Sequence, residues 1–540
     1  MKNVKLLDCT LRDGARIINC EVPDKDIKKI ISRLTESHID YVEVGFLRDH
    51  RKLTYKHGST FFTSVKQIEP FIDVDTKSNT KYLAFVDYGM FDFDSLDECD
   101  GKSVDGIRVG FTKGDYEKER KNLLAAFEKV KQKGYMLFIQ GVNSLGYTDS
   151  EILELCGMLN EIMPYGFGIV DTYGSMYLED VDRIYSIVNH NLDKRIAIDF
   201  HAHNNRQMAF ALSQEVMRLD AGRREIIIDA TLEGMGKCAG NLNIELMVDL
   251  LTKKHKYDYN FDLLLDTIDE CLYEIKQNHE WGYTIPNLMG GIYQTHPNNV
   301  LYLNDKFRLN NKDIKNIVSM IEQEKKHHYD YDYLENLYLE YSESKIDDSK
   351  SLEFIKDTFN GKSVLILAPG RSIIDFKADI DKFAEEEKPI IVSVNFISGY
   401  KDSFAFFGNK KRYENTEGTK SNERLIATTN VTLDDSKNKV INFYSLIDRR
   451  YKMYDNSVMM LLSLLNIAGV KKITLAGCDG YSETVADNYF DSEFGNNRHR
   501  KQFGEINCNV GGMLSDFINK VSGRIEVKFL TPSIYQQYIK

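Results

Sequence analysis

The chain has 540 residues, too many for one hydrophobic core, since domains usually hold roughly 50–250 residues. Its hydrophobic content of 42% and aromatic content of 11% are those of an ordinary globular protein. The formal net charge of -12 disfavours a nucleic-acid partner, because phosphate binding needs a basic surface, although it is compatible with a local basic patch.

The cysteine pattern and the N-terminal residues indicate the cellular compartment of the protein. The 8 cysteines are scattered without a CxxC pair, so neither a disulfide framework nor a zinc knuckle is indicated. The first residues lack a basic-then-apolar signal pattern, and no stretch approaches the ~20 apolar residues that span a bilayer. We therefore expect a cytoplasmic protein with no membrane span.

The first 236 residues alternate between apolar strand patterns and helical patterns. The strand candidates are nearly continuous apolar runs, as expected when helices bury both faces of a parallel sheet. Such a series favours a (β/α)₈ TIM barrel over an open sheet, with its chemistry at the carboxyl ends of the strands. The candidates span residues 4–10, 40–46, 81–88, 106–112, 135–143, 167–173, 196–203 and 225–231.

The rest of the sequence predicts a helical connector and a second domain. After the barrel, taken as residues 1–300, a polar helical connector covers 301–360, with a linker near 345–350. Strand and helix patterns return over 361–540, which favours a smaller Rossmann-like α/β domain with a doubly wound sheet.

A His-x-His triplet at the end of the seventh barrel strand is the strongest indication of chemistry. Residues two apart on a strand point to the same side, so His201 and His203 can hold one divalent cation. Such a pair alone is more often a surface or core pair. Asp13, after the first strand, and Asn241, after the eighth, would reach the same end of a barrel.

Four motifs in chain order resemble the DRE-TIM metallolyases, which include hydroxymethylglutaryl-CoA lyase, 4-hydroxy-2-oxovalerate aldolase and the isopropylmalate and homocitrate synthases. The resemblance covers about residues 1–300. The motifs are Thr-Leu-Arg-Asp-Gly at 10–14, Val-Glu-Val-Gly at 42–45, His-Ala-His-Asn-Asn at 201–205 and Gly-Met-Gly-Lys-Cys-Ala-Gly-Asn at 234–241.

The resemblance implies a role for each matching residue. Asp13, His201 and His203 would bind the cation, and Asn241 would complete the set. Arg12 would face the carbonyl oxygen that becomes an enolate. Glu43 would be a positioning carboxylate near the site; the alternative is that it braces the barrel floor. Mixed nitrogen and oxygen ligation suits Mn or Mg, with Zn and Co as alternatives.

The general base is where the sequence departs from the family. Arg16 stands where pyruvate aldolases carry His and the condensing synthases Gln, and arginine is a poor base because it stays protonated. Arg16 could instead bind a substrate carboxylate or phosphate. The base is then a metal-bound hydroxide or a residue that the sequence does not identify. Cys238 is a candidate acid, and Tyr293 and His296 are candidates to line the mouth.

Other polar residues have weaker interpretations. Asp171 ends the sixth strand and is either a site residue or part of a structural turn. The remaining histidines, including His327 and His328, are expected to be solvated.

The second domain carries a glycine turn that opens a helix, which can direct backbone N–H groups at phosphate. Its pattern resembles the bacterial sialyltransferase-like Rossmann-type domains, although Ala368 replaces their first glycine. That resemblance implies a nucleotide-sugar site; the alternative is a degenerate α/β domain that serves assembly. The candidate residues are Gly370, Ser372, Asn395 and Asp479.

These observations predict a divalent-metal-dependent aldolase or lyase acting on a 2-oxo acid such as pyruvate, with an aldehyde partner that is a sugar derivative if the second domain serves cell-surface glycan synthesis. The alternatives are a Claisen condensation of an acyl-CoA with a 2-oxo acid, and a non-catalytic scaffold barrel fused to a glycosyltransferase-like domain. We also expect a homo-oligomer.

Overall fold

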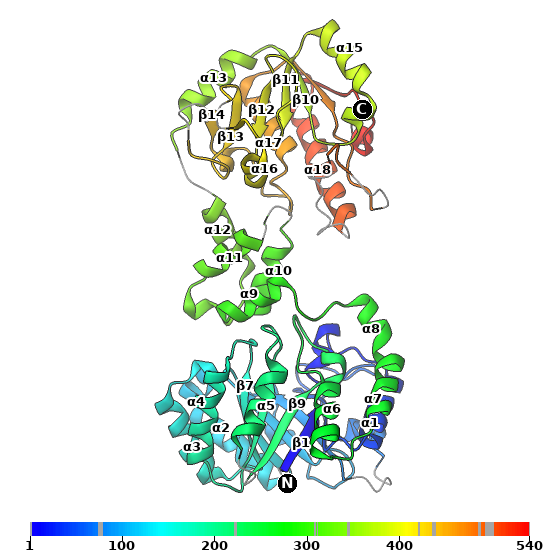
Figure 1. Ribbon diagram of the computed structural model, residues 1–540, viewed down its shortest axis with the longest axis vertical. Coiled ribbons are helices and arrows are strands. Elements are labelled where there is room, and N and C mark those ends of the chain that lie inside the picture. The colour runs from blue at the N-terminus through cyan, green and yellow to red at the C-terminus, as the bar shows by residue number, and fades with distance from the viewer. Residues whose placement is uncertain are drawn as a thin grey trace. The chain divides into compact units, whose positions relative to one another are not determined.

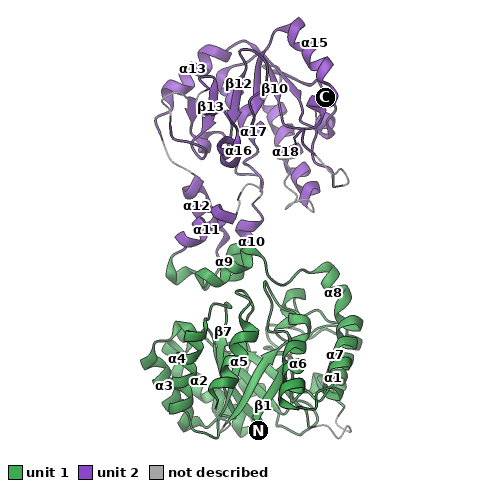
Figure 2. Ribbon diagram, in the orientation of Figure 1, with its two compact units in different colours: residues 1–300, 322–329 green, residues 301–321, 330–540 purple. Residues whose placement is uncertain are grey.

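The computed structural model describes residues 3–73, 79–220, 224–306, 309, 311–342, 346–419, 422–434, 439–483, 488–491 and 502–538. The chain divides into two compact units, residues 1–300 with 322–329 and residues 301–321 with 330–540 (Figure 2). The expected connector, 301–360, is thus shared between the units. The expected linker near 345–350 begins outside the described residues, and helix α13 (Ser349–Phe359) already covers its last positions.

The first unit is a closed parallel barrel, which confirms the predicted (β/α)₈ fold. The ring closes because β1 pairs with both β9 and β2, and the short β3 (Phe61–Phe62) lies outside it, paired with β2. The ring order is β1 (Asn3–Asp8), β9 (Glu225–Ala230), β8 (Ala197–Ala202), β7 (Gly166–Asp171), β6 (Met136–Gly141), β5 (Gly106–Phe111), β4 (Lys81–Asp87) and β2 (Tyr41–Leu47).

Amphipathic helices surround the ring (Figure 1). In α1 the buried positions include Ile27, Ile30 and Leu34, spaced three and four apart along one helix face. α2 and α3 each begin with a capping box, in which a threonine and an acidic residue satisfy the first free backbone N–H groups. The helices are α1 (Asp24–Glu36), α2 (Lys113–Gln132), α3 (Asp149–Ile162), α4 (Leu178–Asn191), α5 (Ala209–Leu219) and α6 (Ile244–His255).

Further helices follow the barrel. The segment 322–329 comes later in the chain and packs against the start of α10. His296 N donates to Lys326 O over 2.7 Å, and Asn299 Nδ2 donates to His328 O over 2.9 Å. These bonds carry His327 and His328 back to the barrel unit. The helices are α7 (Phe261–Thr267), the π-helical turn η7 (Ile268–Leu272), α8 (Tyr273–Asn278), α9 (Ile285–Tyr293) and α10 (Pro297–Asn304).

The second unit is built on an all-parallel sheet covered on both faces, in agreement with the predicted α/β class. Its order reverses at β10, as in doubly wound sheets. The strand order is β14 (Lys439–Ile441), β13 (Leu425–Thr428), β12 (Phe404–Phe407), β11 (Ile390–Val394), β10 (Ser363–Leu367), β15 (Lys472–Ala476) and β16 (Glu526–Phe529). The helices are α13, α14 (Ser372–Asp375), α15 (Lys377–Glu387), α16 (Lys410–Asn415), α17 (Ser457–Ala468) and α18 (Phe503–Val521).

The connector helices α11 (Asn311–Met320) and α12 (Tyr331–Ser342) belong to the second unit. Glu335 on α12 accepts hydrogen bonds from Tyr302, Lys306 and Tyr454. Tyr338 OH donates to Asp455 Oδ2 over 3.0 Å. A half-buried ion pair held by tyrosines therefore attaches these helices to the α/β domain. Each helix among the described residues is too short or too polar to span a bilayer.

Candidate active site

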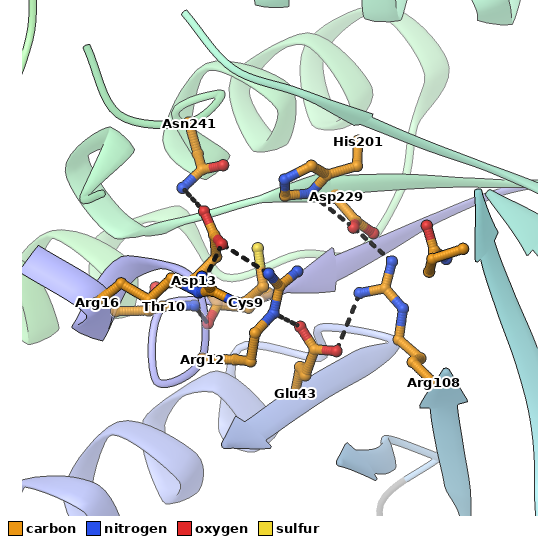
Figure 3. Close-up of polar contacts among 12 residues, drawn as sticks. Cys9, Thr10, Arg12, Asp13, Arg16, Glu43, Arg108, His201, Asp229 and Asn241 are labelled. Carbon is orange, nitrogen blue, oxygen red and sulfur yellow. Dashed lines mark hydrogen bonds and ion pairs between the residues drawn. The ribbon is translucent and has the colours of Figure 1, made fainter. Parts of the chain in front are cut away.

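The side chains expected to bind a metal converge at the carboxyl ends of three adjacent strands, β1, β9 and β8. His203 Nε2 lies 3.7 Å from Asp13 Oδ2 and 3.3 Å from His201 Nε2. The ligand atoms of these three residues all lie within 4.8 Å of one another. Asn241 donates from Nδ2 to Asp13 Oδ2 over 3.0 Å (Figure 3). The four residues that the motifs indicated therefore face one small volume.

Both imidazoles are held in the neutral form that metal binding requires. Burial, helped by the charge of Arg12 and opposed by Asp13, lowers the pKa of His201 to about 4. Burial also lowers the pKa of His203 to about 4. Asp229 Oδ2 lies 2.9 Å from His201 Nδ1. With this carboxylate as acceptor, the proton sits on Nδ1 and Nε2 keeps its lone pair towards His203.

The two oxygen donors complete a set that fits a divalent cation. Burial alone would raise the pKa of Asp13, but the adjacent guanidinium of Arg12 lowers it well below its usual range. Asn241 uses Nδ2 for Asp13 and Met235 O, while its Oδ1 is buried without a hydrogen-bond partner among the described residues. A buried acceptor without a partner costs free energy, and a cation at this point would satisfy it.

Arg12 is fixed beside these ligands on three sides. Its Nε donates to Glu43 Oε2 over 2.5 Å and its Nη1 to Asp13 Oδ1 over 2.6 Å. The guanidinium carbon lies 4.5 Å from the centroid of the Phe85 ring. Its Nη2 has no hydrogen bond with a described residue, and Arg12 lines the cleft at the barrel mouth. This donor is free for a substrate oxygen.

A buried charge network beneath the mouth was missed at the sequence level. Arg108 on β5 is fully buried and lies 3.2 Å from Glu43 and 2.6 Å from Asp229 (Figure 3). It also lies 2.7 Å from Asp199. Glu43 therefore bridges two arginines, and Asp229 links Arg108 to His201. Charged residues inside otherwise apolar strands are the signal that could have identified this network, since buried charges are kept only when paired.

A cleft of about 580 Å³ opens beside the candidate ligands. Tyr173 OH lies 2.8 Å from His327 Nδ1, and the two rings stack at 5.6 Å. The prediction of a solvated side chain is therefore wrong for His327, which is half-buried; His328 is exposed but also lines the cleft. No spacing in the sequence connects 327–328 to the barrel mouth, because only tertiary packing returns this segment there.

Comparison with known families identifies the barrel. The HMGL-like family matches residues 3–270. This part of the chain is an HMGL-like domain. The resemblance to the DRE-TIM metallolyases, read from four motifs, is thereby confirmed.

The HMGL-like domain is similar to several named proteins. An oxaloacetate decarboxylase of Mycobacterium tuberculosis is 27% identical over 273 residues, covering 48% of this chain and 74% of the relative. A 4-hydroxy-2-oxovalerate aldolase of Moorella thermoacetica is 22% identical over 318 residues, covering 58% and 90%. The solved HMG-CoA lyase of Brucella melitensis has 14% identity and a TM-score of 0.42, covering 51% of this chain and 100% of that structure.

Arg16, at the position where the sequence predicted a base, forms long ion pairs with two carboxylates of the HMGL-like domain. Its Nη2 lies 3.4 Å from Asp87 Oδ2, an oxygen that Arg48 Nη2 approaches more closely, at 2.8 Å. Arg16 Nε is 3.6 Å from Asp13 and has no hydrogen-bond partner among the described residues. Arg16 lines the cleft.

The remaining candidates of the HMGL-like domain are placed unequally. His296 lines the cleft, whereas Tyr293 and Cys238 are not among the described residues that form it. Burial raises the pKa of the Cys238 thiol to about 11, so it is protonated at neutral pH. Asp171 accepts from Ser175 N over 2.8 Å and Met176 N over 3.1 Å, which supports the structural-turn interpretation.

In the second unit the four candidate residues bond to the protein itself. Ser372 N donates to Asp479 Oδ2 over 2.9 Å, so a carboxylate occupies the place expected for phosphate. A Cβ on Gly370 would lie 2.3 Å from Gly477 O, which explains the glycine by close packing. Asn395 bonds Ser457 Oγ and Gly408 N. These contacts lend no support to phosphate binding by the turn.

Proposed function

We propose that the HMGL-like domain is a divalent-metal-dependent lyase or aldolase that breaks or makes a carbon–carbon bond next to the carbonyl of a 2-oxo acid. The observation that carries this proposal is the convergence of Asp13, His201 and His203 beside the free Nη2 of Arg12. Asp13, His201, His203 and Asn241 would hold the cation, with Mn or Mg favoured over Zn or Co.

When bound, the cation would supply Lewis acidity towards the carbonyl of the 2-oxo acid. Arg12 donates from Nη2 to the oxygen on which negative charge develops, and its orientation is set by Glu43 and Asp13. Asp229 keeps the proton of His201 on Nδ1, and Arg108 keeps Asp229 in place. The chain therefore contributes preorganised charges that need no rearrangement during the reaction.

Two reactions satisfy this geometry, and the proton donors and acceptors distinguish them. Aldol addition to pyruvate needs a base that removes a methyl proton. Decarboxylation of a 2-oxo dicarboxylic acid needs none, because departure of CO₂ leaves the same carbanion. Arg16 at the expected base position favours decarboxylation as a second candidate, in line with the name of the mycobacterial relative.

His296 lines the cleft and can donate a hydrogen bond to a substrate there. Its Nδ1 accepts from Asn298 N over 3.1 Å, so Nε2 carries the proton. Burial, helped by the charges of Lys237, His328 and Arg16, lowers the pKa of His296 to about 4. His296 therefore donates a hydrogen bond from Nε2 and does not carry a charge at neutral pH.

The experiment is proton exchange in D₂O by the full-length protein with Mn²⁺ or Mg²⁺, followed by NMR of the pyruvate methyl group. Exchange that stops on chelation supports aldolase chemistry; pyruvate formation from oxaloacetate without exchange supports decarboxylation. Thiol release from acetyl-CoA would instead identify Claisen condensation. A chain that retains no metal and turns over no 2-oxo acid is the scaffold, and the proposal then fails.

For the second unit, nucleotide-sugar binding and a role in glycan synthesis stay predictions. A cleft of about 710 Å³ beside the carboxyl ends of β10 and β11, lined among others by Phe396, Tyr400 and Lys411, supports them by combining aromatic and cationic groups. Titration of the full-length protein with nucleotide-sugars, followed by protein NMR or calorimetry, tests them. No binding would favour the assembly role.

A further inference from the structure

The cleft of the HMGL-like domain extends across the barrel mouth, well beyond the candidate ligands. Those ligands follow β1, β8 and β9, yet the lining reaches Thr112–Gly114 after β5 and Asn143 after β6. In the ring order, β5 and β6 lie opposite β9 and β1. A volume of about 580 Å³ is in the range of sites for whole metabolites. A three-carbon 2-oxo acid at the ligands would leave most of this space for its reaction partner.

The charge of the lining is opposite to that of the chain. The whole chain carries -12, but the cleft is lined by four Lys or Arg side chains and two Asp side chains. Three of the positive charges are balanced or shared: Arg12 by Asp13, Lys113 by Glu151 at 2.7 Å, and Arg16 by Asp87, which Arg48 also uses. The excess positive charge therefore lies with Arg16 and Lys237.

Lys237 and Arg16 share one corner of the cleft with His296. Among the described residues Lys237 has no ion-pair partner, and its side chain is exposed. All three residues line the cleft, and Lys237 and Arg16 are permanent charges close enough to act on the His296 imidazole. The guanidinium carbon of Arg16 lies 4.8 Å from the centroid of the Phe46 ring, which holds its plane. Its Nε is buried without a hydrogen-bond partner among those residues.

These groups are complementary to an oxyanion. A held guanidinium offers parallel N–H donors, a lysine adds a point charge, and the neutral His296 donates from Nε2. Arg16 faces two carboxylates that other arginines also use, Asp87 at 3.4 Å and Asp13 at 3.6 Å. Lys237 and the Nε2 of His296 have no acceptor among the described residues.

We propose that Arg16, Lys237 and His296 bind a phosphate or carboxylate group carried by the part of the substrate that is not the 2-oxo acid. This inference rests on the proposed function, since it assigns the partner of that reaction: an anionic aldehyde, in place of a small apolar one. It also explains Arg16 as a binding residue at the position where the pyruvate aldolases that the sequence resembles carry His.

Direct binding tests the corner without any reaction. Inorganic phosphate is titrated into full-length protein freed of metal with EDTA, and ³¹P NMR or calorimetry gives the affinity. We expect saturable binding that Lys237→Ala weakens at least about tenfold. Lys254→Ala, the same change at an exposed position of α6 outside the cleft, keeps the wild-type affinity. Equal affinity in wild type and Lys237→Ala would overturn the proposal.

A turnover series separates the two anions. With pyruvate and metal, kcat/KM is compared for glyceraldehyde 3-phosphate, succinic semialdehyde and the neutral glyceraldehyde. A preference for the first identifies a phosphate, and a preference for the second a carboxylate. In Lys237→Ala the ratio of anionic to neutral substrate falls about tenfold, and in Lys254→Ala it does not change.

The outcomes keep the two proposals apart. Pyruvate proton exchange without preference for either anionic aldehyde overturns the anion site and leaves the proposed function standing. Phosphate binding that depends on Lys237, without reaction of any 2-oxo acid, supports the anion site and overturns the proposed function.

Discussion

The barrel mouth and the strand ends of the second unit occupy equivalent positions on parallel sheets, yet they differ in how their polar groups are satisfied. At the mouth, neither the buried Asn241 Oδ1 nor Arg12 Nη2 has a hydrogen-bond partner among the described residues. In the second unit, Ser372 bonds Asp479 and Thr531, and Asn395 bonds Ser457. One set is arranged for a ligand, and the other holds two loops together.

This difference shows that position at a strand end identifies a candidate site only in part. The carboxyl ends of parallel strands collect polar residues in both units. What separates a binding site from a structural junction is whether the protein already supplies each partner. Four substitutions, with their controls, test whether the two regions differ in this way.

Asp13→Ala should have the largest effect. It removes one candidate ligand and the acceptor for both Arg12 and Asn241, so turnover of the 2-oxo acid should fall on the order of 10³-fold or more. Mn²⁺ content after gel filtration should fall with it. Asp479→Ala is the matched control in the second unit and should leave both measurements unchanged. Comparable losses in Asp13→Ala and Asp479→Ala would show that the barrel mouth and the second unit do not differ in this respect.

Arg108→Met should mainly cost stability. It leaves Glu43, Asp199 and Asp229 as buried carboxylates without their shared cation, a loss of about 3–5 kcal/mol in the free energy of unfolding. Denaturant unfolding of the full-length protein measures it. Arg16→Met, at the partly exposed mouth, should cost less than about 1 kcal/mol. Similar costs for the two variants would argue against the buried network.

Asp229→Asn should weaken metal binding by about 10–100-fold, because the carboxylate orients His201 without being a ligand itself. Titration with Mn²⁺ monitored by electron paramagnetic resonance gives the affinity. Asp171→Asn, at the end of the neighbouring β7, is the control, since the Asp171 carboxylate bonds only the backbone of its own turn in the described contacts. An unchanged affinity in Asp229→Asn would remove the assigned role.

Asp479→Ala should have the smallest effect. Ser372 N and Oγ lose their acceptor, which should cost about 1–3 kcal/mol. Thermal unfolding shows this as a lower Tm for the second unit. A gain in stability would mean that Asp479 is a strained binding group, and the two regions would then be alike.

Much of the fold and of the site could be predicted from the sequence, for local reasons. Continuous apolar strands separated by amphipathic helices predict a barrel, and the His-x-His spacing places His201 and His203 on one side of β8. The Arg108 network and the return of His327 were missed. Both depend on pairs distant in sequence, such as Arg108 with Asp229, separated by 121 positions.

Side-chain period and strand direction are local properties of the chain, so the sequence is enough to tell which reactive groups lie at strand ends. Which of those groups are already paired follows from the folded structure alone. Asp13 and Asn241, 228 positions apart, bond each other, and the Oδ1 of Asn241 has no partner among the described residues. Ser372 and Asp479, 107 apart, satisfy one another. Hydrogen-bond satisfaction depends on contacts and burial that appear only when the chain has closed on itself.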